Sequence, residues 1–247
     1  MEIKNKFNMT QEQNIFLAKR NIVDSIWKSS HIEGIEITYP ETQKIYDGGN
    51  VAHLRIDEIQ TVNNLKHSWI FILNSMGVEN NLNLIKSINA LVGSNLVDRA
   101  GNLRNYNVKI GGTNWKPELP NEEKINQDLK EIDKIEDVTD RAITYMCYIM
   151  RTQMFSDGNK RTAMLFANKI MIENGKGIIS IPVEYDNIFG EKLTKYYESN
   201  DMTELKQWIY DKCIDGIEYQ EENNLDIINK IKVTEEVSSE SEEEAEM

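Results

Sequence analysis

The chain has few of the residues that mark secreted or membrane-spanning proteins. Its 247 residues include only two cysteines and four prolines. Cys147 and Cys213 are isolated, so we expect buried thiols and no disulfide framework. No apolar run approaches the roughly 20 residues of a membrane-spanning helix, and Trp69 to Leu73 is far too short. Residues 1–6 contain no apolar signal region. These absences predict a cytoplasmic protein with no membrane partner.

Positive charge is also scarce. Twenty-eight lysines and arginines face 41 aspartates and glutamates, which gives a net charge of −13. Residues 234–247 contain seven glutamates and no cation, so the rest of the chain carries only −6. Sequence-independent nucleic-acid binding needs clustered cations, and we therefore expect no nucleic-acid partner. The polar, low-complexity segment 234–247 is predicted to be a disordered acidic tail.

Apolar residues make up 40% of the chain, enough for a core, and most of them recur at helical spacing. The pattern predicts an all-α fold. Thr10 and Gln13, and Thr38 and Glu41, have the spacing of capping boxes. Residues 99–120 break the helical pattern, and 107–112 alternate and end in glycines, which suits a short β-hairpin. Helices are expected over residues 10–32, 38–46, 56–76, 81–96, 122–135, 139–152, 159–174, 187–198, 202–215 and 218–233.

The most informative stretch is residues 153–164, Gln-Met-Phe-Ser-Asp-Gly-Asn-Lys-Arg-Thr-Ala-Met. Apolar runs flank it, so we expect a helix, a loop and a second helix that begins near Gly158. A helix N-terminus presents free N–H groups to anions, and Lys160 and Arg161 add charge beside them. Asp157 is placed to hold a hard cation such as Mg²⁺ beside phosphate oxygens. The stretch predicts a polyphosphate site; the alternative is an ordinary turn followed by a solvated cation pair.

This loop resembles the signature of the Fic/Doc (Fido) family, His-x-Phe-x-Asp/Glu-Gly/Ala-Asn-Gly/Lys-Arg, with Phe155 and residues 157–161 in register. Residues 29–34, Ser-Ser-His-Ile-Glu-Gly, resemble the family's inhibitory motif. Residues 100–104 followed by 108–112 resemble the segment that leads into its target-docking flap. The resemblance covers most of residues 20–215. It implies a Fido-type helical bundle with residues 1–50 as inhibitory helix and linker, and residues 51–233 as the core.

The family transfers part of a nucleotide, most often AMP from ATP, to a hydroxyl of a target protein. The resemblance therefore implies ATP and Mg²⁺ as cofactors and a protein partner. It assigns the metal to Asp157 and the phosphates to Gly158, Asn159, Lys160 and Arg161. The signature His, the general base, is replaced here by Gln153, whose amide cannot take a proton. A positioned base contributes ~10²–10⁴-fold, so we expect impaired transfer.

The resemblance assigns a regulatory role to Ser29, Glu33 and Gly34. In the family the Glu pairs with a second Arg, but that position is Met164. Glu33 is therefore a weak brake, a brake that uses Lys160, or a relic. The charged end of an ordinary amphipathic helix is the simpler explanation. His31 lies between Ser29 and Glu33 and is either a substitute base or a solvent-facing side chain.

The resemblance assigns target docking to a flap of five residues, Val108, Lys109, Ile110, Gly111 and Gly112. The alternative is a hairpin that only stabilises a loop. Arg104 either pairs with an acid or holds the base of the flap. The Asn-Lys-Arg ending resembles the Doc branch, which transfers phosphate instead of AMP.

Three functions follow as hypotheses. The chain is an AMP-transferring enzyme, a degenerate module that binds nucleotide or a partner without turnover, or an active enzyme into which Gln153 was introduced. A homo-oligomer is left open.

Overall fold

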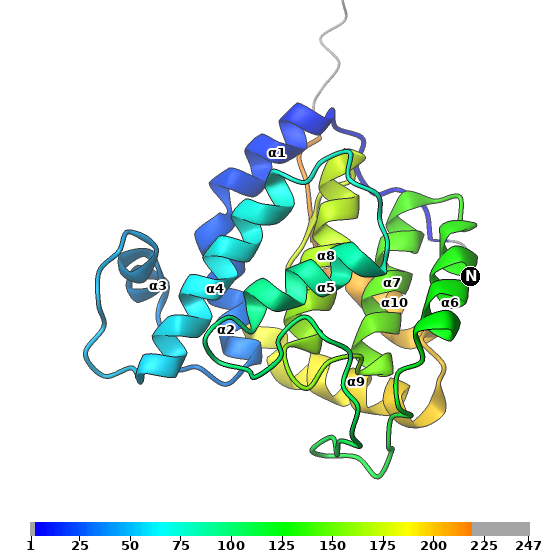
Figure 1. The fold of residues 1–247 in the computed structure, drawn as a ribbon. Helices are drawn as coiled ribbons and strands as arrows, with labels where there is room; N and C mark the ends of the chain where they lie inside the picture. The colour runs from blue at the N-terminus through cyan, green and yellow to red at the C-terminus, as the bar shows by residue number, and fades with distance from the viewer. Residues whose placement is uncertain (1–2, 219–247) are drawn as a thin grey trace, which may run out of the picture. The chain divides into compact units, whose positions relative to one another are not determined.

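The structure is a computed structural model that describes residues 3–218, and Figure 1 shows its fold. Within these residues the secondary structure is almost entirely helical, which confirms the predicted all-α class. The elements are α1 (Gln11–Arg20), α2 (Ile22–Ile32), α3 (Tyr39–Tyr46), α4 (Ile56–Leu73), α5 (Leu82–Val92), α6 (Glu122–Asp133), α7 (Val138–Thr152), α8 (Asn159–Glu173), β1 (Ile178–Ile179), the 3₁₀ turn η1 (Val183–Tyr185), α9 (Asp186–Ser199), α10 (Thr203–Lys212) and β2 (Ile214–Asp215). None of these helices is both long and apolar enough to cross a membrane.

The core is built around α8. All of its residues except Lys160 and Glu173 are buried. It packs most extensively against α7, and α1, α4 and α5 also contact it. Figure 1 shows α8 behind α5 and beside α7. Flexible methionines fill this centre, as predicted from their spacing: Met146, Met150, Met154, Met164 and Met171 are all buried.

The predicted helix 10–32 is two helices. The capping box of Thr10 and Gln13 forms as expected and starts α1. The helix ends at Asn21, whose side-chain amide donates to the carbonyl of Leu17 at 2.9 Å. Such local amide bonds compete with the helical ladder, and apolar spacing does not reveal them. A similar correction applies to α7, which is capped by Asp137 rather than by Thr139 or Asp140.

The strand pair lies elsewhere than predicted. β1 and β2 form a two-stranded antiparallel sheet, with Ile178 opposite Asp215. Residues 108–112 are an irregular loop with a turn at Gly111 and Gly112. The segment that would return beside them has other partners, because Thr113 donates to Glu198 and Trp115 stacks on Tyr197. Pro117 has no N–H to contribute.

The predicted helix 218–233 and the acidic tail 234–247 lie outside the described residues. Of the N-terminal segment 1–50, α2 and α3 both pack against α4. The end of α2 is thereby brought to the first turn of α8, where the candidate site is found.

Candidate functional site

The loop between α7 and α8 is held by two residues with positive φ angles. Gln153 ends α7 at φ 48°, and Gly158 begins α8 at φ 75°. A β-carbon at Gly158 would lie 2.7 Å from Cγ1 of Val92 on α5. Only glycine combines this backbone conformation with so close an approach. The predicted start of the second helix is therefore confirmed, and α5 supplies the reason for the glycine.

Asn159 organises the loop from within. Its Oδ1 accepts from the N–H of Phe155 at 3.0 Å, and its Nδ2 donates to the carbonyl of Phe155 at 2.9 Å. Nδ2 also lies 3.1 Å from Oε1 of Gln153, and the side chain is buried. The predicted contact between this amide and phosphate would require it to leave these partners. Asn159 therefore fixes the conformation of the loop, and its contact with phosphate stays a prediction.

Asn89 on α5 braces the loop from outside and was not found by sequence reasoning. Its Nδ2 donates to the carbonyl of Asp157 at 3.0 Å and to Oγ1 of Thr162 at 3.1 Å. Its Oδ1 accepts from the N–H of Gly101 at 2.9 Å. The only signal in the sequence is an amide on the apolar face of a helix.

The side chain of Gln153 is tied into the protein. Its Nε2 donates to the carbonyl of Met150 at 2.6 Å and lies 3.3 Å from the hydroxyl of Tyr197. Burial raises the pKa of Tyr197 far above its usual range. That phenol therefore stays protonated at neutral pH. His31 Nε2 lies 2.8 Å from the carbonyl of Ile37, and a role of this side chain as a substitute base stays a prediction.

The first turn of α8 presents positive charge. Gly158 offers no side chain to cap it, so the N–H groups of the following residues point out of the helix without a capping group. Arg161 is 6% exposed, and its Nη2 lies 3.0 Å from Oδ2 of Asp157. Asp157 and Arg161 thus share one neighbourhood, and the turn combines a helix dipole, a guanidinium and a carboxylate.

Glu33, at the end of α2, lies on this turn. Its carboxylate oxygens are 3.4 Å from Nζ of Lys160 and 3.3 Å from Nε of Arg161. Lys160 also donates to the carbonyl of Ile32 at 3.1 Å. Glu33 Oε1 and Arg161 Nε are buried without an aligned hydrogen bond, so the contacts are ionic. Of the alternatives for Glu33, the structure has it paired with Lys160 and also with Arg161.

The other residues of the motif are spread around this contact. Gly34 continues the chain at φ 76° after the end of α2. Ser29 is buried one turn earlier and faces a small void that it shares with Met164 and Trp69. Ser29 therefore packs toward the core side of α8, whereas Glu33 reaches its first turn.

Arg104 holds the base of the flap. Its guanidinium donates to the carbonyls of Gln153 at 2.6 Å, Tyr106 at 2.8 Å and Glu118, and its backbone N–H donates to the carbonyl of Met154. Burial lowers the pKa of this guanidinium. Residues 108–112 beyond it are exposed or half-buried. Of the two roles predicted for Arg104, the structure shows the second, and target docking by Val108 to Gly112 stays a prediction.

Asp157 is the carboxylate that the sequence assigns to a metal, and alone it fits only a metal that is bound together with a nucleotide. No group of three His, Cys, Asp or Glu side chains lies together within residues 3–218. Asp157 is a single carboxylate with 56% of its side chain exposed. Mg²⁺ is usually held by one or two carboxylates together with substrate phosphates, so Asp157 suffices only alongside a phosphate.

Comparisons with known proteins show which family model and which solved structures this chain resembles. Residues 80–171 match the model of the Fic/DOC family. No curated protein matches the chain. Three solved structures resemble it: Fic-1 (residues 134–508) from C. elegans, at 20% identity and TM-score 0.68; a Fic family protein from Desulfovibrio desulfuricans G20, at 18% and 0.65; and a Fic domain-containing signaling protein from Bacteroides thetaiotaomicron VPI-5482, at 16% and 0.64.

The alignments cover 79%, 81% and 80% of this chain, and 62%, 65% and 80% of the respective structures. The chain thus spans less than two thirds of the first two, and identities this low establish the fold alone. The chain has the Fic fold, and its residues 80–171 are similar to the Fic/DOC family model.

Proposed function

We propose that this protein binds ATP with Mg²⁺ at the first turn of α8 and transfers AMP to a hydroxyl of a target protein, at a rate strongly reduced by Gln153. One observation carries the proposal: the carboxylate of Glu33 forms ion pairs with Lys160 and Arg161 at the start of α8, where no side chain caps the helix. A protein anion on Lys160 and Arg161 occupies the place that a phosphate group of the nucleotide would take. The Fic fold supports this assignment.

The chemistry explains why transfer is expected to be slow. The target hydroxyl oxygen attacks the α-phosphorus, a new oxygen–phosphorus bond forms, and the bond to the β-phosphate oxygen breaks so that pyrophosphate leaves. The hydroxyl proton must go to a base. Neither the amide of Gln153 nor the protonated Tyr197 beside it can accept the proton, so it must pass to water. The loss is ~10²–10⁴-fold relative to a chain with a base.

The chain's own residues supply binding and orientation. Arg161 and the N–H groups of the first turn would hold phosphate oxygens, and Asp157 would hold Mg²⁺ beside them. The ion would neutralise phosphate charge. Glu33 must move away before this can happen, so its ion pairs with Lys160 and Arg161 act as a brake on nucleotide binding.

A second candidate function is a binding module without turnover. The three polar contacts of the Gln153 amide favour it, because they make this residue part of the scaffold. A third is phosphate transfer, which Lys160 favours through the resemblance to the Doc branch. The introduced-glutamine hypothesis predicts the same behaviour as the first proposal once Gln153 is changed to His.

One labelling experiment separates these functions. The full chain and its Gln153→His variant are incubated with Mg²⁺, host-cell lysate and ATP labelled at either the α- or the γ-phosphate. We expect weak α-label transfer by the unmodified chain and at least ~10²-fold more by the variant. Label from the γ-phosphate only would replace AMP transfer by phosphate transfer. Nucleotide binding without label from either chain would support the binding module. No nucleotide binding in calorimetry would refute every nucleotide-based function and leave only a module that binds a partner.

A further inference from the structure

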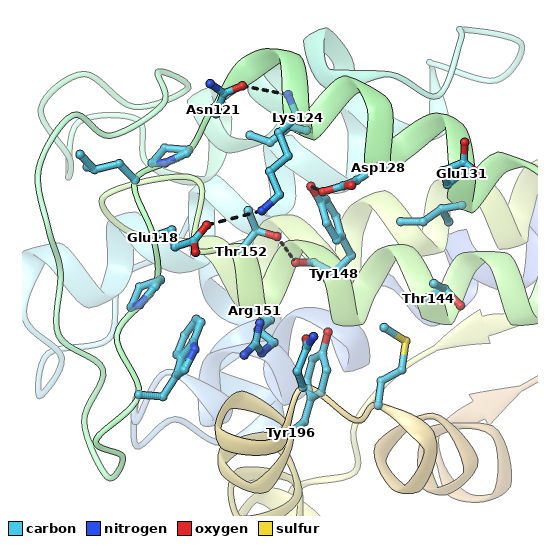
Figure 2. Close-up of a pocket in the computed structure, with 18 of the residues that line it drawn as sticks. Glu118, Asn121, Lys124, Asp128, Glu131, Thr144, Tyr148, Arg151, Thr152 and Tyr196 are labelled. Carbon is cyan, nitrogen blue, oxygen red and sulfur yellow. Dashed lines mark hydrogen bonds and ion pairs between the residues drawn. The ribbon is translucent and has the colours of Figure 1, made fainter.

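A second concave site lies away from the first turn of α8. A cavity of about 630 Å³ opens between the segment 115–121, α6, the C-terminal half of α7 and the ends of α9 and α10. Figure 2 shows the residues that line it. Its volume lies within the ~300–1,000 Å³ that small-molecule sites usually have. Its wall carries flat rings from three elements, Trp115, Tyr148 and Tyr196, beside Pro117 and Met202.

Arg151 is the cation held against the aromatic wall of this cavity. Its guanidinium carbon lies 4.7 Å from the ring centre of Trp115 and 5.9 Å from that of Tyr196. Figure 2 shows Arg151 and Tyr196 side by side. Its Nε and Nη2 both donate to the carbonyl of Tyr197, at 3.2 and 3.1 Å, which orients the group. Among residues 3–218 no carboxylate pairs with Arg151.

Two acids in the wall are in ion pairs with lysines, and the third accepts a hydrogen bond. Glu118 lies 3.4 Å from Nζ of Lys124, and Glu131 lies 2.7 Å from Nζ of Lys134. Asp128 accepts the hydroxyl of Tyr148 at 2.8 Å. Lys116, at the exposed edge, has no acidic partner among the described residues. Arg151 and Lys116 are thus the lining cations without an ion-pair partner among the described residues, and the planar guanidinium of Arg151 suits a carboxylate.

We propose that this cavity is a second ligand site, which binds a small carboxylate with a flat, apolar body, and that Arg151 receives the carboxylate. The aromatic wall takes the flat body, and Lys116 adds long-range attraction at the edge. The site is separate from the nucleotide site and does not depend on the proposed transfer reaction.

The site has a physical connection to the loop at Gln153. The carbonyls of Pro117 and Glu118, in the cavity wall, accept from the Arg104 guanidinium that also binds the carbonyl of Gln153. Trp115 stacks on Tyr197, with ring centres 5.2 Å apart. Bound ligand is therefore expected to slow amide hydrogen exchange in residues 104–121 as well as near Arg151, which locates the site independently of affinity.

The test uses the full chain and three probes of similar shape, indole-3-acetate, indole-3-acetamide and tryptamine, with phenylacetate and hippurate as further carboxylates. We expect saturation-transfer NMR and titration to show at least one carboxylate binding about tenfold or more tightly than the neutral and cationic probes. Arg151→Gln should weaken binding by at least about tenfold. Lys116→Glu, at an exposed position that leaves the fold intact, should weaken it severalfold.

Arg20→Gln and Lys19→Glu make the same chemical changes on the exposed face of α1, outside the cavity, and should bind as the unmodified chain does. The proposal is overturned if no carboxylate binds at millimolar concentration, or if the acetamide binds as well as the acetate. The proposal would also be overturned if the Lys116→Glu and Lys19→Glu variants bound the carboxylate equally tightly. Slower amide hydrogen exchange on ligand binding only outside residues 104–121 would overturn it too.

Discussion

Glu33 Oε2 lies 3.3 Å from Nε of Arg161, so the residue that follows α2 contacts the first turn of the central helix α8. Glu33 Oε1 lies 3.4 Å from Lys160 as well. Both partners of the Arg161 contact are largely buried, with 7% and 17% of the side chains exposed. A pair so shielded is weakened little by salt, and a phosphate must displace it to reach the same cations.

We expect Glu33→Gln to tighten the binding of ATP with Mg²⁺ by about tenfold, ~1.4 kcal/mol, because the neutral amide no longer competes for Arg161 and Lys160. Calorimetry on the full chain measures the effect. Glu36→Gln is the matched control, since Glu36 is exposed three residues further on. Unchanged or weaker ATP affinity in Glu33→Gln would show that the carboxylate does not obstruct the site.

A second prediction concerns the backbone at Gly158. Gly158→Ala should destabilise the fold by about 2 kcal/mol or more, because alanine is strained at φ 75° and its β-carbon would meet Val92. Thermal and denaturant unfolding measure the loss.

The double variant with Val92→Ala separates the two causes. Val92→Ala opens space beside residue 158 but leaves its φ angle unchanged. Gly158→Ala should therefore lower the free energy of unfolding less in the Val92→Ala background than in the unmodified chain, but should still lower it. Strict additivity of the two single changes would mean that the contact with Val92 contributes nothing. If Gly158→Ala cost no stability in the Val92→Ala background, backbone strain would contribute nothing.

Helix starts and core positions were predictable from the sequence. Thr38 and Glu41 start α3 through a capping box, and Gly158 starts α8, because these signals act within one helical turn. The burial of the core methionines also followed from spacing alone. Periodicity could not show the break at Asn21, since apolar residues continue on both sides of it and a single side-chain hydrogen bond ends the helix.

The site was predictable only in part. Asp157 lies just before α8 and Arg161 on its first turn, four residues later, so their proximity followed from the motif. Asn89 is brought to the loop by the packing of α5 on α8, which no local pattern encodes. The hairpin prediction was misplaced for a similar reason, because alternation marks an extended segment but does not reveal whether a partner strand is available.

A third prediction tests Arg104 as the clamp of the flap. Arg104→Lys keeps the charge but loses the planar fork, so the carbonyls of Gln153, Tyr106 and Glu118 cannot all be satisfied. We expect a loss of about 2 kcal/mol in the free energy of unfolding and faster amide exchange in residues 153–158. Arg99→Lys, an exposed position nearby, is the control. A variant as stable as this control would exclude the clamp.

The fourth prediction concerns pH and the pair of lysines on Glu204. Lys192, at 2.7 Å, and Lys195 both bond this carboxylate and lower its pKa from 4.5 to about 2. Because the pKa of Glu204 is lower in the folded state, its ion pairs stabilise the fold at any pH above the pKa of the unfolded state. That contribution is lost as the pH falls from 4.5 towards 2. Glu204→Gln should therefore lower the melting temperature slightly at pH 7, and the difference should shrink below about pH 4. High salt should shrink it too, because the pair is exposed. Glu191→Gln, on α9 beside Lys192, controls for the loss of a negative charge, and a difference that grows on acidification would contradict the assignment.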